Sequence, residues 1–354
     1  MRSEEKVLVT GAGGFIGGRV VEVMYLTRSF TPRAGVRSWA SAVRVGRFPV
    51  EIKRVDLLNR EEVDHATEGV SYVVHCAYGP GGATVEGTGN LMEVLATKPI
   101  KGIVHLSTIA VYGNAEGIID ETHACDFSGN EYADSKLEAE RICLRYAEKG
   151  TPVTILRLPI VYGPFSRNWT IQIANMLAIS SLGLNEQFER GKCNLLYIDD
   201  LVAAIHKALS SGTGIGKILN VNGPEVVSWN DYFRRFNDGL GLPPLKPRPL
   251  GQANLVANLM RPVRSMGKYL LANHAAIIKN LASAVPAIGR SLISAERTLR
   301  LTPVREDLAL YSRDAVYSPG NIRKVLGFEP QVGVDEGLRH SISWLKQQGF
   351  LWNP

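Results

Sequence analysis

Short apolar runs alternate with longer amphipathic stretches through the first half of the chain. The runs are rich in Val and Ile and are bounded by Gly or Pro, which is typical of strands buried in a parallel sheet. The expected strands are Lys6–Thr10, Ala34–Arg37, Val50–Asp56, Tyr72–Ala77, Ile103–Ser107 and Thr154–Leu158. The expected helices are Phe15–Leu26, Arg60–Ala66, Gly87–Ala96 and Tyr132–Lys149. This alternation predicts an α/β fold, a Rossmann doubly wound sheet of parallel strands.

The alternation becomes irregular in the second half. The elements expected there are strands at Cys193–Ile198 and Ile218–Val221 and helices at Asp199–Leu209, within Asn321–Pro330 and at Asp335–Lys346. We therefore expect residues 1–163, together with 192–225, to form a dinucleotide-binding domain. Residues 164–191 and 226–354 are expected to form a smaller, mostly helical substrate-binding cap.

The positive charge of the chain is concentrated in one segment. The sequence carries a formal charge of +6, and residues 243–300 contain nine Lys or Arg but a single acid, Glu296. This segment therefore carries +8 and the remainder −2. Aromatic residues are nearly absent among these cations, so a stacking platform for nucleic acid is missing and no nucleic-acid partner is expected. The pattern predicts a basic amphipathic insertion in the cap over residues 243–305.

Three interpretations of this insertion are open. The preferred one is a solvated cationic face on the cap. A second is a pair of interfacial helices that makes peripheral membrane contact through residues 252–300 and gives access to a lipid-like substrate. A third is cationic recognition of a phosphorylated substrate.

Composition argues against several other classes of protein. The chain has no uncharged apolar run of about 18 residues that would span a membrane, and the apolar run after Lys6 is too short for a signal peptide. The four cysteines never form a Cys-x-x-Cys pair; they are Cys76, Cys125, Cys143 and Cys193. We expect no disulfide framework, no metal site and a location in the reducing cytoplasm.

A glycine-rich turn follows the first expected strand and precedes the first expected helix. Its glycines, Gly11, Gly14 and Gly17, follow the spacing G-x-x-G-x-x-G. The first permits a tight turn, the second lets the backbone approach a pyrophosphate, and the third lets helix and strand pack closely. The helix N-terminus then receives the negative charge. We expect this turn to hold a dinucleotide, with Phe15 and Ile16 between the last two glycines also in contact.

The end of the second strand indicates which dinucleotide is bound. An NAD enzyme usually has an acid there for the ribose 2′-hydroxyl, but no Asp or Glu occurs from Thr27 to Val50. Arg37 stands there instead, and a 2′-phosphate favours a cation. We therefore expect NADP, with NAD as the alternative and Arg37 as the main contact. The other interpretation of Arg37 is a solvated surface cation.

Two further positions are expected at the cofactor. Asp56 and Leu57 follow the third strand, where an acid can contact the adenine amino group. The alternative interpretation of Asp56 is a helix N-cap for Leu58–Ala66. Ala77 closes the fourth strand and is expected to lie close to the cofactor.

A tyrosine and a lysine provide the candidate chemistry. Tyr132 and Lys136 are four residues apart and so share one helical face. A nearby lysine and a positively charged nicotinamide ring would lower the tyrosine pKa and make it a usable acid or base. Thr108, directly after the fifth strand, is the expected hydroxyl that polarises a substrate carbonyl.

Taken in order, these motifs resemble the extended short-chain dehydrogenase/reductases. The matching segments are the glycine turn, Asp-Leu, His-x-Ala, Ser-Thr-x-x-Val-Tyr-Gly, Tyr-x-x-x-Lys and Leu-Arg-Leu-Pro-Ile-Val-Tyr-Gly-Pro. The resemblance implies Thr108, Tyr132 and Lys136 as the catalytic set, with the last two also touching the cofactor. It further implies that Pro159 and Val161 lie near the nicotinamide and that the protein forms a homodimer.

Departures from this family's subgroups narrow the reaction. Nucleotide-sugar dehydratases carry Asp-Glu after the threonine, but Ile109 and Ala110 stand here and neither exchanges a proton. An arginine that anchors many nucleotide-sugar substrates is replaced by Cys193. We therefore expect an NADP-dependent oxidoreductase acting on a ketone or secondary alcohol. The alternatives are a nucleotide-sugar epimerase or reductase and a non-catalytic dinucleotide-binding sensor or scaffold.

Overall fold

The computed structural model describes residues 5–255, 257–260, 262 and 299–350. The chain divides into two compact units. The first comprises Met1–Tyr162, Asn194–Glu225 and Ala315–Gly333, and the second comprises Gly163–Cys193, Val226–Asp314 and Val334–Pro354. Most of the expected basic insertion, including most of the proposed membrane-contacting segment 252–300, lies outside the described residues.

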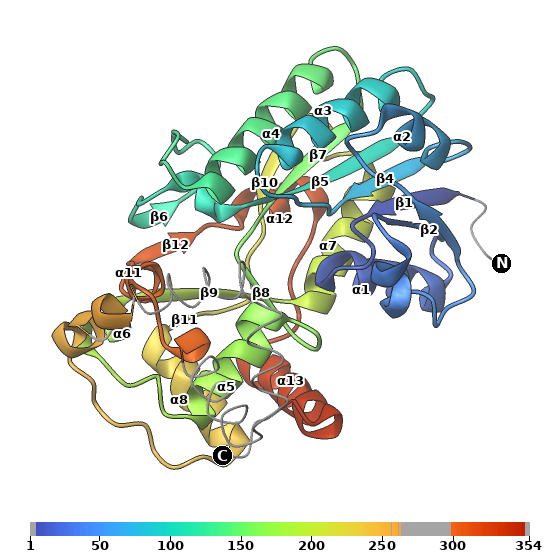
Figure 1. Ribbon diagram of the computed structural model, residues 1–354. Helices are drawn as coiled ribbons and strands as arrows, with labels where there is room; N and C mark the ends of the chain where they lie inside the picture. Colours follow the sequence, from blue (N-terminus) through green and yellow to red (C-terminus); the bar gives the residue numbers. More distant parts are fainter. Residues whose placement is uncertain (1–4, 256, 261, 263–298, 351–354) are drawn as a thin grey trace. The chain divides into compact units, whose positions relative to one another are not determined.

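A seven-stranded sheet forms the centre of the first unit (Figure 1). Its strand order is β10-β7-β5-β4-β1-β2-β3, and neighbouring strands are parallel. The strands are β1 Lys6–Thr10, β2 Thr31–Val36, β3 Glu51–Arg54, β4 Tyr72–His75, β5 Gly102–Thr108, β7 Val153–Leu158 and β10 Ile218–Asn220. The order reverses between β1 and β4, which is the switch point where doubly wound sheets bind ligands.

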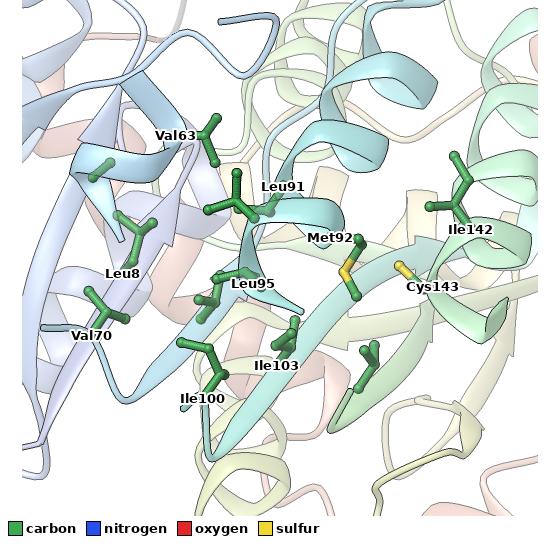
Figure 2. Close-up of a cluster of buried hydrophobic side chains, with 14 of the residues drawn as sticks. Leu8, Val63, Val70, Leu91, Met92, Leu95, Ile100, Ile103, Ile142 and Cys143 are labelled. Carbon is green, nitrogen blue, oxygen red and sulfur yellow. The ribbon is translucent and has the colours of Figure 1, made fainter. Parts of the chain in front are cut away.

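Helices cover both faces of this sheet. One face carries α2 Arg60–Ala66, α3 Ala83–Leu95 and α4 Glu131–Ala147, and the other carries α1 Phe15–Thr27 and α7 Ile198–Ser211. Figure 2 shows the apolar core under α2, α3 and α4. Its members include Leu8, Leu91, Met92, Ile103 and Ile142. This two-sided cover explains why the strands read as nearly continuous apolar runs.

Shorter elements complete the first unit. They are the helical turns η1 Trp39–Arg44 and η2 Ile109–Tyr112, strands β6 Gly117–Ile119, β8 Ile160–Tyr162, β9 Lys192–Tyr197 and β12 Ala315–Tyr317, and helix α12 Gly320–Leu326. Strand β12 pairs with β6, and β8 pairs with the second half of β9, residues Leu195–Tyr197. The parallel doubly wound sheet expected from the sequence is confirmed.

Most element boundaries lie within two residues of those predicted, but two starts differ by three or more residues. Strand β2 begins at Thr31 rather than Ala34, because Pro32 and Arg33 pair with β1 and are buried despite their weak strand propensity. Helix α3 begins at Ala83 rather than Gly87, after Gly82 in the left-handed region. Polar and glycine residues hide both starts in the sequence pattern.

The second unit is mainly helical. Its helices include η3 Arg167–Gln172, α5 Ile173–Ala178, α6 Glu186–Arg190, α8 Trp229–Leu240, α11 Arg305–Tyr311 and α13 Val334–Gln348, and it contains strand β11 Val226–Ser228. Aromatic side chains form its core: the Trp229 and Tyr311 ring centroids lie 4.4 Å apart, and Phe233 contacts Tyr311 edge-on at 5.3 Å. Within the described residues, no helix is long and apolar enough to cross a membrane.

Candidate functional site

A cavity of about 560 Å³ opens in the first unit at the carboxyl ends of β1, β2, β3 and β4. This is the position that the strand order predicts for a ligand. Its lining includes eight residues from the expected site or its motifs: Thr10, Gly11, Gly14, Arg37, Asp56, Leu57, His75 and Ala77. The cavity therefore unites three separate sequence motifs at one edge of the sheet.

Three glycines in and after the turn have no room for a side chain. Gly11 has φ +66°, and a Cβ there would lie 3.0 Å from the Ala77 backbone. At Gly17 a Cβ would lie 2.5 Å from the Gly11 carbonyl oxygen. At Gly13, which the motif leaves variable, it would lie 2.3 Å from the carbonyl oxygen of Ser41. The turn is thus fixed by close backbone contacts with β4 and η1.

The N-terminus of α1 is left open to a ligand. Gly14 occupies the N-cap position, no side chain caps the helix, and its first turn contains no acid. Such an end presents backbone N–H groups and a partial positive charge. Phe15 and Ile16 begin this helix, but neither they nor Gly17 line the cavity.

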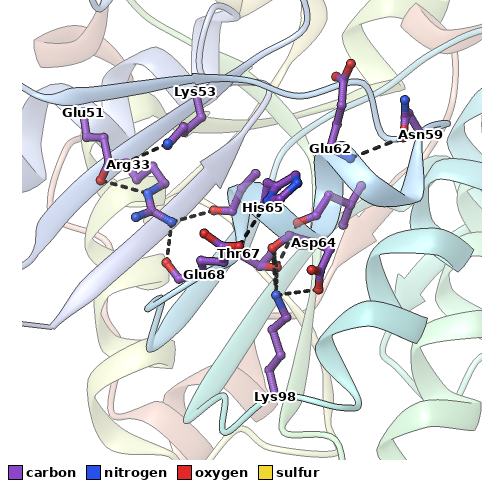
Figure 3. A network of polar contacts seen from close by, with 12 residues as sticks. Arg33, Glu51, Lys53, Asn59, Glu62, Asp64, His65, Thr67, Glu68 and Lys98 are labelled. Atoms are coloured by element: carbon purple, nitrogen blue, oxygen red, sulfur yellow. Dashed lines mark hydrogen bonds and ion pairs between the residues drawn. The ribbon is translucent and has the colours of Figure 1, made fainter.

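Four arginines lie within or after β2, and they serve different purposes. Arg33 is buried, forms an ion pair with Glu51 at 2.9 Å and donates to two carbonyls at the end of α2 (Figure 3). Arg44 donates to the Phe15 carbonyl at 2.8 Å. Arg47 pairs with Glu22. Arg37 is exposed and is the arginine of these four that lines the cavity.

The end of β3 supplies an acid and an apolar residue. Asp56 and Leu57 both line the cavity. The alternative role for Asp56 as a helix cap is wrong, because Asn59 caps α2 by accepting from Glu61 and Glu62 N–H. Asp56 instead accepts from the Leu58 N–H at 3.1 Å. The more local signal, Asn59 directly before the helix, identifies the cap correctly.

The end of β4 and the loop after it contribute residues to which the sequence assigned no role, Tyr78 and His75. Ala77 lines the cavity and lies against Gly11. Tyr78 also lines the cavity, and its ring packs edge-on against Tyr132 with centroids 5.2 Å apart. His75, which appeared only as part of a motif, is buried and bonded through both ring nitrogens.

Two of the three candidate catalytic groups, Thr108 and Tyr132, interact through their hydroxyls. Thr108 ends β5, and Tyr132 lies in the first turn of α4, which Asn130 caps. The residue Tyr132 is 41% exposed, yet burial around its hydroxyl raises the pKa of Tyr132, and a hydrogen bond with Thr108 opposes this rise. The phenol therefore remains protonated at neutral pH in the protein alone.

The third group, Lys136, lies on α4 four residues after Tyr132. Its ammonium donates to the Leu106 carbonyl at 2.8 Å and lies 5.9 Å from the Tyr78 ring centroid. Burial lowers the pKa of Lys136 to about 8. The expected lowering of the Tyr132 pKa by Lys136 is not found in the protein alone, because the ammonium is directed at the strand carbonyl.

Two expected cofactor contacts lie elsewhere in the first unit. Pro159 separates β7 from β8, and Val161 is buried within β8, where it pairs with Leu196. Neither lines the cavity. Their assignment came from the family resemblance, and it remains a prediction.

A buried ion pair fixes the helix that carries Tyr132 and Lys136. Arg157 on β7 donates to both oxygens of Glu140 on α4, at 3.0 and 2.7 Å. Both side chains are almost fully buried, at 5% and 1% exposed. The Arg157 guanidinium also covers the Tyr112 ring at 4.7 Å. The ion pair between Arg157 and Glu140 therefore holds α4 in position on the sheet.

Residues 7–222 match the model of the NAD dependent epimerase/dehydratase family. The chain belongs to this family. Membership makes it an enzyme of the extended short-chain dehydrogenase/reductase type. The glycine cradle, the open N-terminus of α1 and the cavity fit the dinucleotide that the family name implies.

Several known proteins resemble the chain at low identity. A Bacillus subtilis protein named uncharacterized UDP-glucose epimerase YtcB is 26% identical over 63% of this chain and 78% of its own length. Cinnamoyl-CoA reductase 1 of Petunia hybrida is 28% identical over 46% of this chain and 56% of its own. The structure of UDP-glucuronic acid 4-epimerase from Bacillus cereus in complex with NAD is 18% identical, with a TM-score of 0.71 over 97% of this chain and 99% of that one. The last similarity concerns the fold.

Proposed function

We propose that this enzyme transfers hydride between NADP(H) and a ketone or secondary alcohol. The observation that carries the proposal is Arg37 at the rim of the dinucleotide cavity, at the end of β2 where an NAD-specific acid would stand. Arg33, Arg44 and Arg47 are held by other partners. Arg37 is thus the cation of this group that is placed to meet a 2′-phosphate.

The chain's own residues would handle the proton. Tyr132, kept protonated by its raised pKa, donates its hydroxyl proton to a carbonyl oxygen during reduction. Thr108, whose hydroxyl interacts with that of Tyr132, offers a second polar contact to that oxygen. Lys136, anchored to Leu106, supplies positive charge beneath the pair. When bound, the nicotinamide supplies or accepts the hydride.

Cofactor choice is tested by titrating the protein with NADPH and NADH. Arg37→Ala should weaken NADPH binding about tenfold to a hundredfold, the equivalent of one lost charge-assisted contact, and leave NADH binding unchanged. Arg47→Ala is the matched control, because Arg47 follows the same strand but pairs with Glu22. Tighter binding of NADH than NADPH by the unmodified protein would contradict the assignment.

The chemistry is tested separately at two neighbouring phenols. Tyr132→Phe should lower turnover about a hundredfold or more, because the general acid is lost, while NADPH still binds. Tyr78→Phe keeps the ring that packs on Tyr132 and removes a hydroxyl without an assigned role. It should retain most of the activity. Equal loss in both variants would remove the special role of Tyr132.

A nucleotide-sugar epimerase is the second candidate, and the named relative YtcB favours it. Epimerisation regenerates the nicotinamide, so it leaves no net change in absorbance. A panel of ketones with NADPH, run beside UDP-glucose with proton NMR detection of its epimer, separates the two reactions. NADPH consumption with a ketone supports the first, and epimer formation without net oxidation supports the second.

A further inference from the structure

His75 lines the dinucleotide cavity and links the glycine turn to the buried face of α3. It lies on β4 in register with Thr10 of β1 and is 2% exposed. Its Nδ1 lies 2.8 Å from the Thr10 hydroxyl, and its Nε2 lies 3.0 Å from the Thr88 hydroxyl. Both ring nitrogens therefore have a partner, one on each side.

The proton positions in this chain follow from counting donors. The Thr88 hydroxyl has one proton, and it donates that proton to the Thr84 carbonyl at 2.7 Å. Thr88 must therefore accept from His75, which places a ring proton on Nε2. Burial, and the charge of Lys136, lower the pKa of His75 to about 3, so the ring is neutral and Nδ1 carries no proton.

The other end of the chain is then fixed as well. The bare Nδ1 accepts the Thr10 hydroxyl proton, and the Thr10 oxygen accepts the Ala77 N–H at 3.3 Å. Every donor points the same way, from Ala77 through Thr10, His75 and Thr88 to Thr84. A chain of this kind has one proton arrangement at each hydroxyl.

The residues at the two ends are those that shape the cavity. Ala77 lies against Gly11, close enough that a Cβ on the glycine would be 3.0 Å from the alanine backbone. Thr84 lies in the first turn of α3, lines the cavity and exchanges hydrogen bonds with Gly79 at 3.0 and 2.7 Å. The chain thus ties the loop after β4 both to the glycine turn and to α3.

We propose that His75 is a positioning residue for the dinucleotide site. It acts as the neutral Nε2–H tautomer, and its one-way hydrogen-bond chain holds Ala77 against Gly11 so that the turn is formed before the ligand arrives. The inference rests on the proposed dinucleotide function of this cavity and adds the residue that sets its geometry.

Thr88 offers the cleanest place to break the chain, because it is buried and does not line the cavity. Thr88→Val keeps the shape of the side chain and leaves the Nε2–H without an acceptor. It should weaken NADPH binding about fivefold to tenfold, the equivalent of one hydrogen bond. Thr88→Ser restores the hydroxyl and should restore binding.

Thr67→Val is the matched control. Thr67 is also buried, and its hydroxyl donates to the carbonyl four residues earlier, as that of Thr88 does. It lies at the end of α2 and has no link to the cavity. Its variant should lose similar stability while binding NADPH normally, so the comparison removes a general effect on folding.

The tautomer gives a readout that needs no ligand. Nitrogen-15 NMR of histidine-labelled protein, with the His75 signal assigned by its loss in His75→Gln, should show Nε2 protonated and Nδ1 bare from pH 5 to 8. In Thr88→Val the tautomer should become mixed.

Three results would overturn the proposal. The first is a His75 signal with the proton on Nδ1, and the second is NADPH binding by Thr88→Val as tight as that of Thr67→Val. The third is failure of Thr88→Ser to recover binding. Wild-type protein that binds neither NADPH nor NADH would instead refute the dinucleotide function, and the positioning role would fall with it.

Discussion

The carboxyl edge of the sheet is built in two different ways. Around β1 and β2 the backbone forms the surface: Gly11, Gly13 and Gly17 bring main-chain atoms too close for any side chain. Around β4, β5 and β7 the edge is held in place by buried polar side chains, among them His75 and Arg157. The first region is sensitive to added atoms. The second is sensitive to removed ones, because each lost partner leaves a buried polar group unsatisfied.

The second region is tested most severely at the Arg157–Glu140 pair. Glu140→Gln leaves a buried guanidinium without its counter-charge and should lower the free energy of unfolding by about 3–5 kcal/mol. Urea denaturation measures this. Glu138→Gln, two residues away on α4, removes a partly exposed partner of Arg141 and Arg145 and should cost at most about 1 kcal/mol.

A double variant separates charge from packing at the same place. Glu140→Leu combined with Arg157→Met removes both charges and should recover much of the lost stability, as apolar replacements of buried ion pairs often do. A double variant that is less stable than Glu140→Gln would show that Arg157 is needed for its contact with Tyr112 rather than for its charge.

The first region is tested by adding one carbon atom to a helical glycine. At Gly17 of α1 the new Cβ would lie 2.5 Å from the Gly11 carbonyl oxygen, so Gly17→Ala should cost about 2–3 kcal/mol and abolish dinucleotide binding. Gly89→Ala in α3 meets no atom within 4 Å. It should be neutral or stabilise the protein by up to about 1 kcal/mol, because alanine favours helix. Thermal denaturation and NADPH titration check both, and equal behaviour would contradict the steric argument.

The two regions also differ in how far the sequence predicts them. The glycine turn is local, since strand, turn and helix follow one another in the chain, and its spacing identifies it. The spacing of Tyr132 and Lys136 likewise predicts their shared helix correctly. The contact of Lys136 with Leu106 depends on how α4 packs on β5, which no local pattern encodes.

The buried polar side chains are harder to predict from the sequence than the glycine turn, because only the alternation of residues along each strand indicates them. Leu8 and Thr10, Val73 and His75, and Ile103 and His105 are pairs two residues apart, so each polar residue shares a face with a core residue. That alternation could have placed His75 under α3. Its partner Thr88 lies 13 residues along the chain, so the hydrogen bond that fixes its tautomer required the folded structure.

The smallest expected effect is on the pH dependence of the free energy of unfolding, and it differs between the two regions. Burial lowers the pKa of His75 to about 3 and that of His105 well below its usual value. As pH falls below about 6.5, the unfolded chain takes up these protons and the folded chain does not, so stability is complete above that pH and declines toward pH 3. The glycine turn carries no titrating group of its own and contributes nothing to this slope.

Removing one of the two histidines should therefore flatten the decline without abolishing it. Between pH 6.5 and 5.5, His75→Gln should lose about 1 kcal/mol less unfolding free energy than the unmodified protein, and the double variant with His105→Gln should flatten the profile further. Urea denaturation across this range measures both. His105 has no hydrogen-bond partner for either ring nitrogen among the described residues, so its replacement should leave NADPH binding intact while His75→Gln weakens it. An unchanged slope in His75→Gln would mean that this histidine takes up its proton in the folded protein at the same pH as in the unfolded chain. The one-way chain through Thr10 and Thr88 would then be lost as the pH falls below about 6.5.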